Sequence, residues 1–321
     1  MVQQDVVEAI DDLFKDLNHE LKTYLTDAQI AKCYQAFLVA KNGHHGQMRR
    51  SGEPYITHPV AAALILAHMR LDHQTIMATL LHDVVEDTAI SQAELKTQFG
   101  DEVTALVDGV TKLTQIKFES RAEAQAENFR KMVLAMVKDI RVIIVKLADR
   151  FHNMSTLGSM PANKRRRIAI ETLEIYAPIA NRLGMHAVYI ALEDLGFKAL
   201  YPMRYRAIQS AVEKARGHRR ELTQKIEHDL QQALKDLTIP YQHVFGRQKH
   251  LYSIYRKMRE KHRRFLDVFD LYGVRIIVNS VDECYRVLGI VHHRYRPISD
   301  QFNDYIANPK LNGYQSLHTT V

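Results

Sequence analysis

The sequence of 321 residues has little of what disulfide-linked or membrane-spanning proteins need. Its two cysteines, Cys33 and Cys284, lie far apart and have no CxxC partner, which excludes a disulfide framework and favours a reducing compartment. No segment approaches the ~20 consecutive apolar residues of a membrane span. The acidic, amphipathic first residues also lack the basic start and apolar run of a signal peptide. These absences predict a cytoplasmic protein without membrane contact.

Turn-forming residues are scarce as well, with 13 Gly and 8 Pro in the chain. Stretches rich in Ala, Leu, Lys and Glu favour helices over a β-sandwich. Apolar residues make up 46% and charged residues 25%, the balance of a globular protein of one large or two ordinary domains. The net charge of +7 favours a polyanionic partner, either a nucleic acid or a phosphorylated small molecule, and does not distinguish between them.

Apolar spacing predicts helices over most of the first 200 residues. Helical periodicity covers the first 40 residues, a continuous stretch over 60–91, and the segments 94–113, 123–138, 162–182 and 186–200. The segment 142–157 opens with β-branched residues that are typical of a strand. However, Asp149, Asn153 and Thr156 recur at i, i+4 and i+7, so they share one face of a helix. We therefore expect a helix there.

The pattern changes after about residue 200. A Lys/Arg-rich helix is predicted over 204–235, and Val274, Ile276 and Val278 alternate as in a strand. A helix over 283–295 and a strand-like run over 312–321 follow.

These elements predict a mainly α protein with two domains. We expect an all-α domain over residues 1–200 and an α+β domain over residues 201–321. Because the last predicted strand has no downstream partner, we expect this second domain to be incomplete.

The run LLHDVVEDT, residues 80–88, places four ionisable side chains within six positions of an apolar stretch. His82 and Asp83 form a ligand pair that suits Mn²⁺, Fe²⁺ or Zn²⁺, and Glu86 and Asp87 follow one helical turn later. Burying these groups requires a cation or a hydrogen-bonded network.

Two distant residues extend this ligand pair. His58 stands at the start of an apolar helix, and Asp149 lies within the apolar run VKLAD. Together with His82 and Asp83 they offer two imidazoles and two carboxylates, a set that leaves coordination positions open for water and a phosphate oxygen.

Each of these residues also has an ordinary structural explanation. An isolated His-Asp pair is common on helix surfaces, and an isolated His58 is more often a core histidine. Asp149 alone can be a buried ion-pair partner of Arg150 or Lys146. Four further histidines are expected to be solvated: His44, His45, His292 and His293. The combination of the doublet, its i+4 carboxylates and the two distant residues favours a metal site.

Longer runs resemble the hydrolase domain of the RelA/SpoT homologue family. They are RRSGEPYITHPVAAA (49–63), LLHDVVEDT (80–88), DGVTKL (108–113), ENFRKM (127–132), VKLADRFHNMSTL (145–157), IYAPIANRLG (175–184) and ALEDLGFKAL (191–200). The resemblance implies an HD-type enzyme that depends on Mn²⁺ and removes the 3′-pyrophosphate of the alarmones ppGpp and pppGpp. The products are then GDP or GTP and pyrophosphate.

The resemblance also implies a role for each matching residue. It implies that Mn²⁺ is held by His58, His82, Asp83 and Asp149, and that Glu86 and Asp87 position or deprotonate the attacking water. It implies a substrate contact set of Arg49, which packs on the guanine, Arg50 and Ser51 beside it, and Asn153 and Thr156 at the nucleoside.

The second half resembles the pyrophosphokinase, or synthetase, domain of the same family. The runs are GRQKHLYSIYRKM (246–258), DLYGVRIIV (270–278), DYIANPK (304–310) and NGYQSLHTTV (312–321). The resemblance implies Asp270 as a Mg²⁺ ligand and Tyr314 as an aromatic platform for guanine. It implies phosphate contacts by Arg247, Lys249 and Lys257.

Two departures from the family pattern weaken this second site. Gln301 and Asn303 stand where the family usually has an Arg and a Lys. Each lost charge-assisted contact costs on the order of 1.5–3 kcal/mol, so losing both slows transfer roughly a hundredfold or more. The family's second catalytic Glu also falls past residue 321. The sequence therefore predicts that the synthetase half is inactive or regulatory, and that Mg²⁺ is required only if this half functions.

Three other functions stay open. A bifunctional synthetase/hydrolase is disfavoured by Gln301 and Asn303. An RNA- or ribosome-binding regulatory module is motivated by the net charge and the basic run 256–264, but the aromatic interleaving of single-strand platforms is missing. A hydrolase of another nucleotide is the third, since only the EPYITHP and HNMSTL runs favour an alarmone. Ribosomal or regulatory protein partners are expected only through regions past residue 321.

Overall fold

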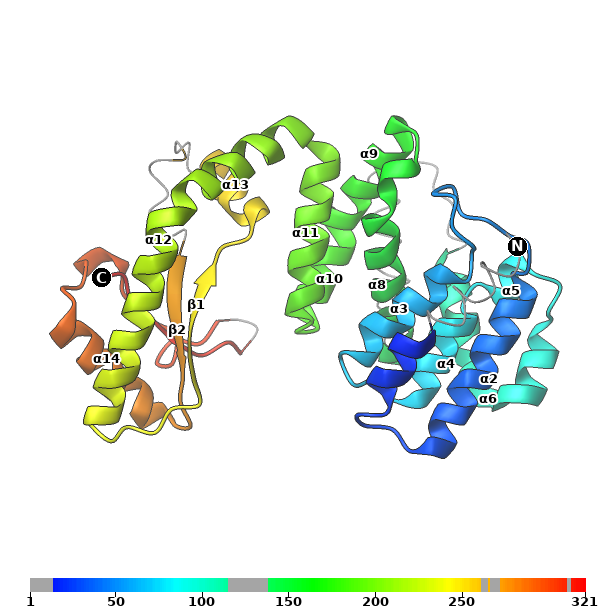
Figure 1. Ribbon diagram of the computed structural model, residues 1–321, viewed down its shortest axis with the longest axis horizontal. Coiled ribbons are helices and arrows are strands. Elements are labelled where there is room, and N and C mark those ends of the chain that lie inside the picture. Colours follow the sequence, from blue (N-terminus) through cyan, green and yellow to red (C-terminus); the bar gives the residue numbers. More distant parts are fainter. Residues whose placement is uncertain (1–13, 115–137, 261–264, 266–271, 311–312) are drawn as a thin grey trace. The chain divides into compact units, whose positions relative to one another are not determined.

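The computed structural model describes residues 14–114, 138–260, 265, 272–310 and 313–321. It divides the chain into two compact units, residues 1–200 (unit 1) and residues 201–321 (unit 2). The described part of unit 1 is helical, and unit 2 combines helices with short strands (Figure 1). The prediction of a mainly α protein is confirmed.

Unit 1 is built from a succession of helices joined by short turns. Its α-helices are α2 (Asp27–Gly43), α3 (Thr57–Ala67), α4 (His73–Leu81), α5 (Val84–Asp87), α6 (Gln92–Thr114), α8 (Ile140–Ser155), α9 (Ala162–Glu171), α10 (Ala177–Arg182) and α11 (His186–Leu200). A 3₁₀ turn, η1 (Leu157–Ser159), follows α8, and a π-helical turn, η2 (Thr172–Tyr176), joins α9 to α10. The helices predicted over 142–157 and 186–200 are confirmed by α8 and α11.

The almost uninterrupted helical stretch predicted over 60–91 is divided by two turns. Arg70 adopts a left-handed backbone conformation with φ of 57°, which ends the first helix. Asp72 then caps α4, since its carboxylate accepts a hydrogen bond from the Thr75 N–H. The second turn, at His82 and Asp83, separates α4 from α5 and so places this doublet at a helix junction.

Two other predicted helices are present with interruptions. Within α6 the chain kinks at Gly100, whose φ of 83° favours glycine. The helix predicted over 162–182 is divided by the π-helical turn Thr172–Tyr176. The helix predicted over 123–138 lies outside the described residues, apart from its last position.

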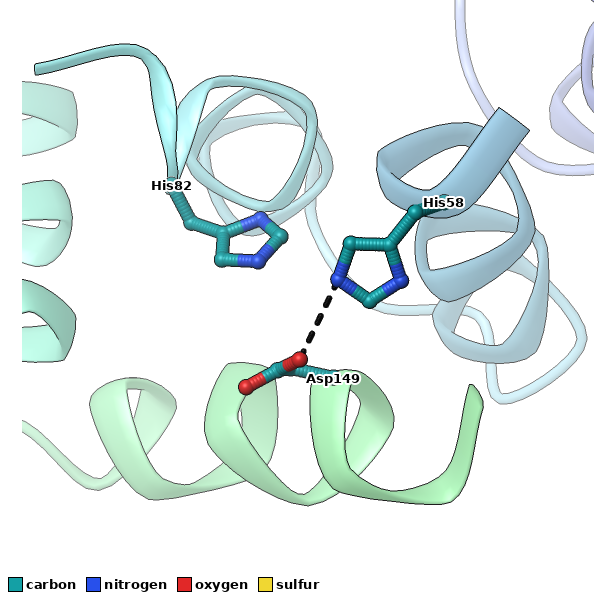
Figure 2. Close-up of side chains that lie close together, drawn as sticks. All are labelled: His58, His82 and Asp149. Carbon is teal, nitrogen blue, oxygen red and sulfur yellow. Dashed lines mark ion pairs between the residues drawn. The ribbon is translucent and has the colours of Figure 1, made fainter. Parts of the chain in front are cut away.

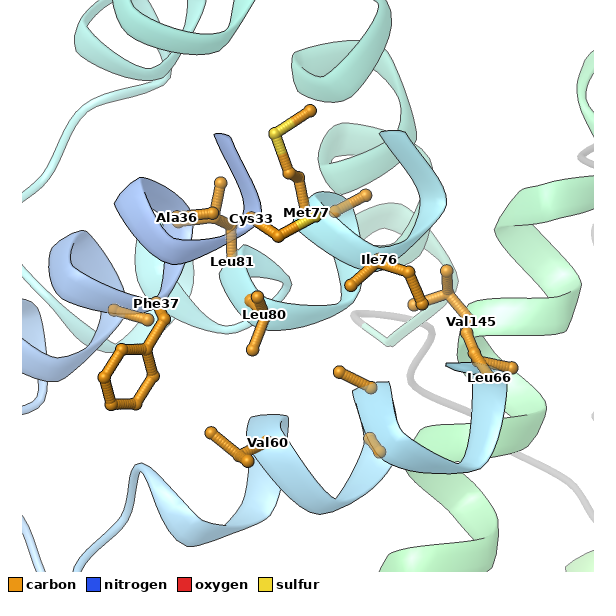
Figure 3. Packing of buried hydrophobic residues seen from close by; sticks show 14 of the residues in the cluster. Cys33, Ala36, Phe37, Val60, Leu66, Ile76, Met77, Leu80, Leu81 and Val145 are labelled. Atoms are coloured by element: carbon orange, nitrogen blue, oxygen red, sulfur yellow. The ribbon is translucent and has the colours of Figure 1, made fainter. Parts of the chain in front are cut away.

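The core of unit 1 gathers apolar side chains from α2, α3, α4, α6 and α8 (Figure 3). Helix α3 packs on both α4 and α8, and α4 also packs on α2. Phe37, Leu66, Ile76 and Leu80 are fully buried there. Burying each such side chain stabilises the fold by about 1.5–3 kcal/mol. This packing fixes the helices α3, α4 and α8 that carry the histidines and carboxylates of interest.

Unit 2 is an α+β unit. Its elements are α12 (Pro202–Asp236), β1 (His243–Gln248), α13 (Leu251–Glu260), β2 (Tyr272–Ile277), α14 (Val281–Arg294), the 3₁₀ turn η4 (Ser299–Gln301), β3 (Asn303–Asp304) and β4 (Leu317–His318). Strands β1 and β2 pair antiparallel, with Val244 opposite Ile276. Strands β3 and β4 form a second, two-residue antiparallel pair.

The elements predicted in unit 2 are largely confirmed. Helix α12 covers 204–235, strand β2 covers the alternating apolar run except Val278, and α14 covers most of 283–295. In the described part of the strand-like run 312–321, strand β4 consists of Leu317 and His318. A small core of Leu230, Leu234 and Val287 lies between α12, α14 and the strands. Among the described residues of both units, no helix has the length and apolar character needed to cross a membrane.

Candidate metal centre

Four side chains from three separate segments of the sequence converge in unit 1. His58 lies in the first turn of α3, His82 caps the end of α4, Asp83 begins α5, and Asp149 lies on α8. Nε2 of His58 is 3.2 Å from Oδ1 of Asp149 and 3.7 Å from Oδ2 of Asp83. Nε2 of His82 is 3.2 Å from Oδ2 of Asp83. Figure 2 shows the two imidazoles pointing toward the Asp149 carboxylate from different helices.

These groups are sequestered from solvent. His58, His82 and Asp149 are 3%, 1% and 4% exposed, and one ligand atom from each lies within 4.8 Å of the other two. Ionised groups buried among apolar helices destabilise a fold unless a counter-charge or hydrogen bonds compensate them. Two imidazoles and a carboxylate at this separation are a donor set that fits a divalent cation. Three of the four predicted ligands thus lie close enough together to hold one ion, and their assignment as ligands stays a prediction.

His82 is oriented by the backbone. Its Nδ1 is 2.7 Å from the Thr79 carbonyl oxygen, and because a carbonyl only accepts, Nδ1 carries a hydrogen. Nε2 is buried, faces Asp83 and has no hydrogen-bond partner among the described residues. It is therefore a candidate ligand atom. Burial alone would lower the pKa of His82, but the charges of Asp83 and Asp149 raise that pKa to about 9. The site therefore stabilises positive charge at this position, which a proton or a divalent cation supplies.

The two oxygens of the Asp149 carboxylate have different partners, the Lys146 ammonium group on one side and the His58 imidazole on the other. Oδ2 accepts a hydrogen bond from buried Lys146 at 2.6 Å, while Oδ1 faces His58 and accepts from the amide of Asn153. Burial opposes ionisation, yet Lys146 and the two histidines hold the pKa of Asp149 well below its ordinary value. The ion pair with Lys146, which was one of the ordinary explanations for Asp149, is thus present alongside the cluster. Arg150 instead pairs with Glu171 at 3.1 Å.

Tyr55 joins two of the carboxylates and was missed by the sequence analysis. Its hydroxyl oxygen is 2.8 Å from Oδ2 of Asp83 and 3.0 Å from Oδ2 of Asp87. Burial, with these two carboxylates, raises the pKa of Tyr55, so the phenol keeps its proton and remains a donor. Its position in the EPYITHP run, three residues before His58, was the available signal.

A tight loop before α3 holds Tyr55 in place. The Tyr55 N–H donates to the Gln47 carbonyl at 2.9 Å, and a β-bridge joins Met48 to Pro54. Gly52, at φ of 90°, allows the chain to reverse between them.

Glu86 and Asp87 lie on the exposed side of the same cluster, on the single turn of α5. Partial burial and the neighbouring Asp83 and Asp87 charges raise the pKa of Glu86. A carboxylate with a raised pKa accepts a proton more readily, as a general base must. The Gln47 side chain holds the Asp87 backbone by donating to its carbonyl at 2.9 Å.

The predicted nucleoside-binding residues are only partly assembled. Arg49 donates to Oδ1 of Asn153 at 3.0 Å and to Oγ1 of Thr156 at 3.2 Å, so these three residues lie together at the end of α8. Arg50 and Ser51 lie exposed at the loop tip, and the structure records no side-chain hydrogen bond from either to this group.

His152 is a second residue that the sequence analysis missed. Its Nδ1 is 2.8 Å from Nδ1 of His58 and 3.2 Å from a guanidinium nitrogen of Arg49. Burial, with the charges of His58 and Arg49, lowers the pKa of His152 to about 4. The available signal was its spacing of three residues from Asp149 on a predicted helix.

The expectation that His44 is solvated is wrong. His44 is 3% exposed, its ring stacks on Tyr55 with centroids 4.5 Å apart, and its Nδ1 lies 2.9 Å from the Gln47 side chain. The sequence hides this because the residue caps α2, and only the fold brings Tyr55 over it. His45 and His293 are exposed as expected, whereas His292 is partly buried and contacts the Thr319 hydroxyl at 2.8 Å.

The candidate residues of unit 2 are spread over separate elements. Arg247 lies on β1, Lys249 follows it, and Lys257 lies on α13. Tyr314 is half-exposed and its hydroxyl is 2.9 Å from Nε2 of His318. Asp270 lies outside the described residues. Within the described parts of the chain, the group of metal-ligating residues that comes together is the one in unit 1.

Comparisons with known proteins divide the chain in the same way. Residues 36–186 match the HD domain family, and residues 246–321 match the region found in RelA / SpoT proteins. The chain is 57% identical over 309 residues to the Bifunctional (p)ppGpp synthase/hydrolase SpoT of Escherichia coli (strain K12), covering 96% of this chain and 44% of the relative.

Two further relatives carry different names. A guanosine-3′,5′-bis(diphosphate) 3′-pyrophosphohydrolase of Vibrio cholerae is 55% identical over 96% of this chain and 44% of its own. A GTP pyrophosphokinase of Streptomyces coelicolor is 50% identical over 91% of this chain and 34% of its own. The chain therefore spans less than half the length of each of these relatives.

Proposed function

The chain belongs to the RelA/SpoT homologue family, and from that premise we propose that unit 1 hydrolyses ppGpp and pppGpp. The products are GDP or GTP and pyrophosphate. The observation that carries this proposal is the convergence of His58, His82 and Asp149 around one buried point, with Asp83 beside both imidazoles. The name of the Vibrio relative supports the choice of the 3′-pyrophosphate as the group removed.

The proposed cofactor is Mn²⁺, held by His58, His82, Asp83 and Asp149. The two carboxylates suit Mn²⁺, the two imidazoles also suit Fe²⁺ or Zn²⁺, and the family resemblance favours Mn²⁺ among them. Nε2 of His82 has no hydrogen-bond partner among the described residues and is an atom that such a cation satisfies. When bound, a divalent cation polarises a phosphoryl oxygen and lowers the pKa of a coordinated water.

In the proposed mechanism, Glu86 and Asp87 manage the proton of the attacking water. Glu86, whose pKa is raised, takes the proton, while Asp87 is held in place through the Tyr55 hydroxyl. The water oxygen forms a bond to the phosphorus that is attached to the ribose 3′-oxygen. The bond between that phosphorus and the 3′-oxygen breaks, and the 3′-oxygen takes up a proton.

Arg49, Asn153 and Thr156 are the proposed contacts to the nucleoside. In the structure the Arg49 guanidinium already lies against the Asn153 and Thr156 side chains, at 3.0 and 3.2 Å. Guanidinium and amide groups offer the planar donors and acceptors that a guanosine requires. Arg50 and Ser51, which are exposed at the loop tip, are proposed as further contacts.

Unit 2 is proposed to be an inactive or regulatory synthetase half. Gln301 and Asn303 remove two positive charges from a site that has to stabilise a highly anionic transition state. A second candidate is a bifunctional enzyme, because the Escherichia coli relative is named as both synthase and hydrolase and the Streptomyces relative as a pyrophosphokinase. Mg²⁺ is then the expected cofactor of unit 2.

A cytoplasmic location is proposed because both cysteines are free.

The test of this proposal is pyrophosphate release from ppGpp by the purified chain and two variants. Asp83→Ala removes a proposed ligand and is expected to lower turnover by about a thousandfold or more. Asp101→Ala removes an exposed carboxylate that pairs with surface Lys96, and should leave turnover unchanged. If Asp83→Ala folds and retains wild-type turnover, the site assignment fails.

A further inference from the structure

The imidazoles of His58 and His82 differ in the hydrogen-bond partner of Nδ1, the ring nitrogen that faces away from the carboxylates. His82 is fixed by a backbone carbonyl, that of Thr79, which no side-chain substitution removes. His58 has no such backbone contact recorded for its Nδ1, which instead lies 2.8 Å from Nδ1 of His152. A contact between two identical ring nitrogens requires that one donates a hydrogen and the other accepts it.

Arg49 settles the direction of this hydrogen bond. One of its guanidinium nitrogens lies 3.2 Å from the same Nδ1 of His152. A guanidinium group only donates, so Nδ1 of His152 must carry a lone pair and no hydrogen. The hydrogen in the short contact therefore belongs to Nδ1 of His58.

The consequence falls on the other side of the His58 ring. With the hydrogen on Nδ1, the neutral ring has its lone pair on Nε2, which faces Asp149 at 3.2 Å and Asp83 at 3.7 Å. A lone pair directed at two carboxylate oxygens is the arrangement that a cation between them stabilises.

We propose that His152 is a positioning residue for the metal centre: it accepts the Nδ1 hydrogen of His58, in a direction set by Arg49, and so holds Nε2 of His58 toward the metal. This inference rests on the proposed function, since it takes His58 as a ligand. It adds a residue to which neither the family motifs nor the names of the relatives assign a role. Loss of such an outer hydrogen bond typically weakens metal binding 10- to 100-fold.

The experiment measures the affinity of the full chain for Mn²⁺ by electron paramagnetic resonance of the free ion. His152→Leu removes the acceptor, and is expected to weaken Mn²⁺ binding about 10- to 100-fold. His152→Asn is the matched variant, because its Oδ1 stands where the imidazole has Nδ1 and also accepts a hydrogen. It should bind Mn²⁺ within about threefold of the wild type, well inside the expected loss.

Other outcomes overturn the inference or its premise separately. If His152→Leu binds Mn²⁺ like the wild type, or raises only the KM for ppGpp through its contact with Arg49, His152 does not position the ligand. If Asp149→Ala also keeps wild-type affinity, the metal centre itself is wrong.

A measurement on the unmodified chain does not depend on how the variants fold: with Zn²⁺ bound, ¹⁵N spectra of the histidine rings should show His58 protonated at Nδ1. Protonation at Nε2 would overturn the inference.

Discussion

The two units carry candidate sites of different construction. In unit 1 the proposed ligands come from helices that pack on one another, and three of the four are at most 4% exposed. In unit 2 the proposed phosphate contacts lie on a strand, a helix and the link between them, and Tyr314 is 36% exposed. A buried cluster of ionisable groups has to be compensated, so it constrains the sequence around it, whereas partly buried charges on separate elements need less compensation. This difference explains why residue chemistry alone points to the first site, while the second depends on resemblance.

The two units should differ most in how strongly the removal of one charged side chain lowers the rate of ppGpp hydrolysis. Asp149→Ala should lower hydrolysis about a thousandfold or more, because it leaves Lys146 and two imidazoles without their carboxylate. Arg247→Ala, in unit 2, should leave it within about twofold, the range of neutral surface changes. Pyrophosphate release checks both variants, and circular dichroism confirms that each is folded. Equal losses would remove the distinction between the units.

Synthetic activity is the next comparison. ATP plus GDP should yield no detectable ppGpp, because Gln301 and Asn303 lack the charges that the family pattern has there, at a cost of roughly a hundredfold or more. Thin-layer chromatography of labelled nucleotides measures the product, with hydrolysis blocked by Asp83→Ala so that ppGpp accumulates. Robust synthesis would show that unit 2 is a working enzyme and would favour the bifunctional candidate.

Two glycine substitutions compare the packing around one helix of each unit, α6 and α14. A Cβ on Gly109, in α6, would lie 2.8 Å from a methyl carbon of Val142 on α8. Gly109→Ala should therefore cost about 1–3 kcal/mol, more than the ~1 kcal/mol that alanine gains in helix propensity. Gly289→Ala, on α14, meets nothing within 4 Å and should be neutral or stabilising. Thermal unfolding followed by circular dichroism distinguishes them. A lower Tm for Gly289→Ala would contradict this account of unit 2.

The two units should differ least in how much stability they lose in acid, because each has a surface ion pair between an arginine and an aspartate. These pairs are Arg141 with Asp72 in unit 1 and Arg294 with Asp229 in unit 2. In unit 1 burial raises the pKa of Asp72, but hydrogen bonds from Thr75 and the charge of Arg141 bring it below its ordinary value. In unit 2 the Arg294 and Tyr295 hydrogen bonds hold the pKa of Asp229 at about 2. Carboxylates with lowered pKa values stabilise the fold above the unfolded pKa of about 4, and lose this contribution as the pH falls through the folded value.

Urea unfolding between neutral pH and about pH 2 tests this sign. The wild type should lose stability as the pH falls, and both Arg141→Gln and Arg294→Gln should show a shallower loss. The effects should be small, because exposed ion pairs contribute little to stability. An unchanged loss in either variant would mean that the carboxylate gains no stability from its arginine, and a steeper loss would contradict the sign.

The convergence of His58, His82 and Asp149 could be predicted because each places a group that is costly to bury in or beside an apolar run. His82 and Asp83 did so together, and Asp149 did so inside a helix whose polar spacing was visible. Tyr55 and His152 could not be found in this way, since a tyrosine near a proline or a histidine next to an asparagine has no pattern of its own. Their importance arises from contacts across about 30 to 100 positions of sequence, such as those of Tyr55 with Asp83 and of His58 with His152.

The fold shows the same limit. Helix positions followed from apolar spacing, but the turn after α3 did not. A left-handed turn residue is expected to be glycine or asparagine, and here it is Arg70, so the sequence does not mark the turn. That turn matters for the site, since it allows α4 to run back over α3 and bring His82 to His58.

The most direct test of the central claim is ppGpp turnover by the full chain as Mn²⁺ is added, removed by a chelator, and added again. A buried set of two imidazoles and two carboxylates that holds one cation predicts that pyrophosphate release requires Mn²⁺, stops with the chelator and recovers on readdition. Turnover that continues unchanged in the chelator would contradict the account.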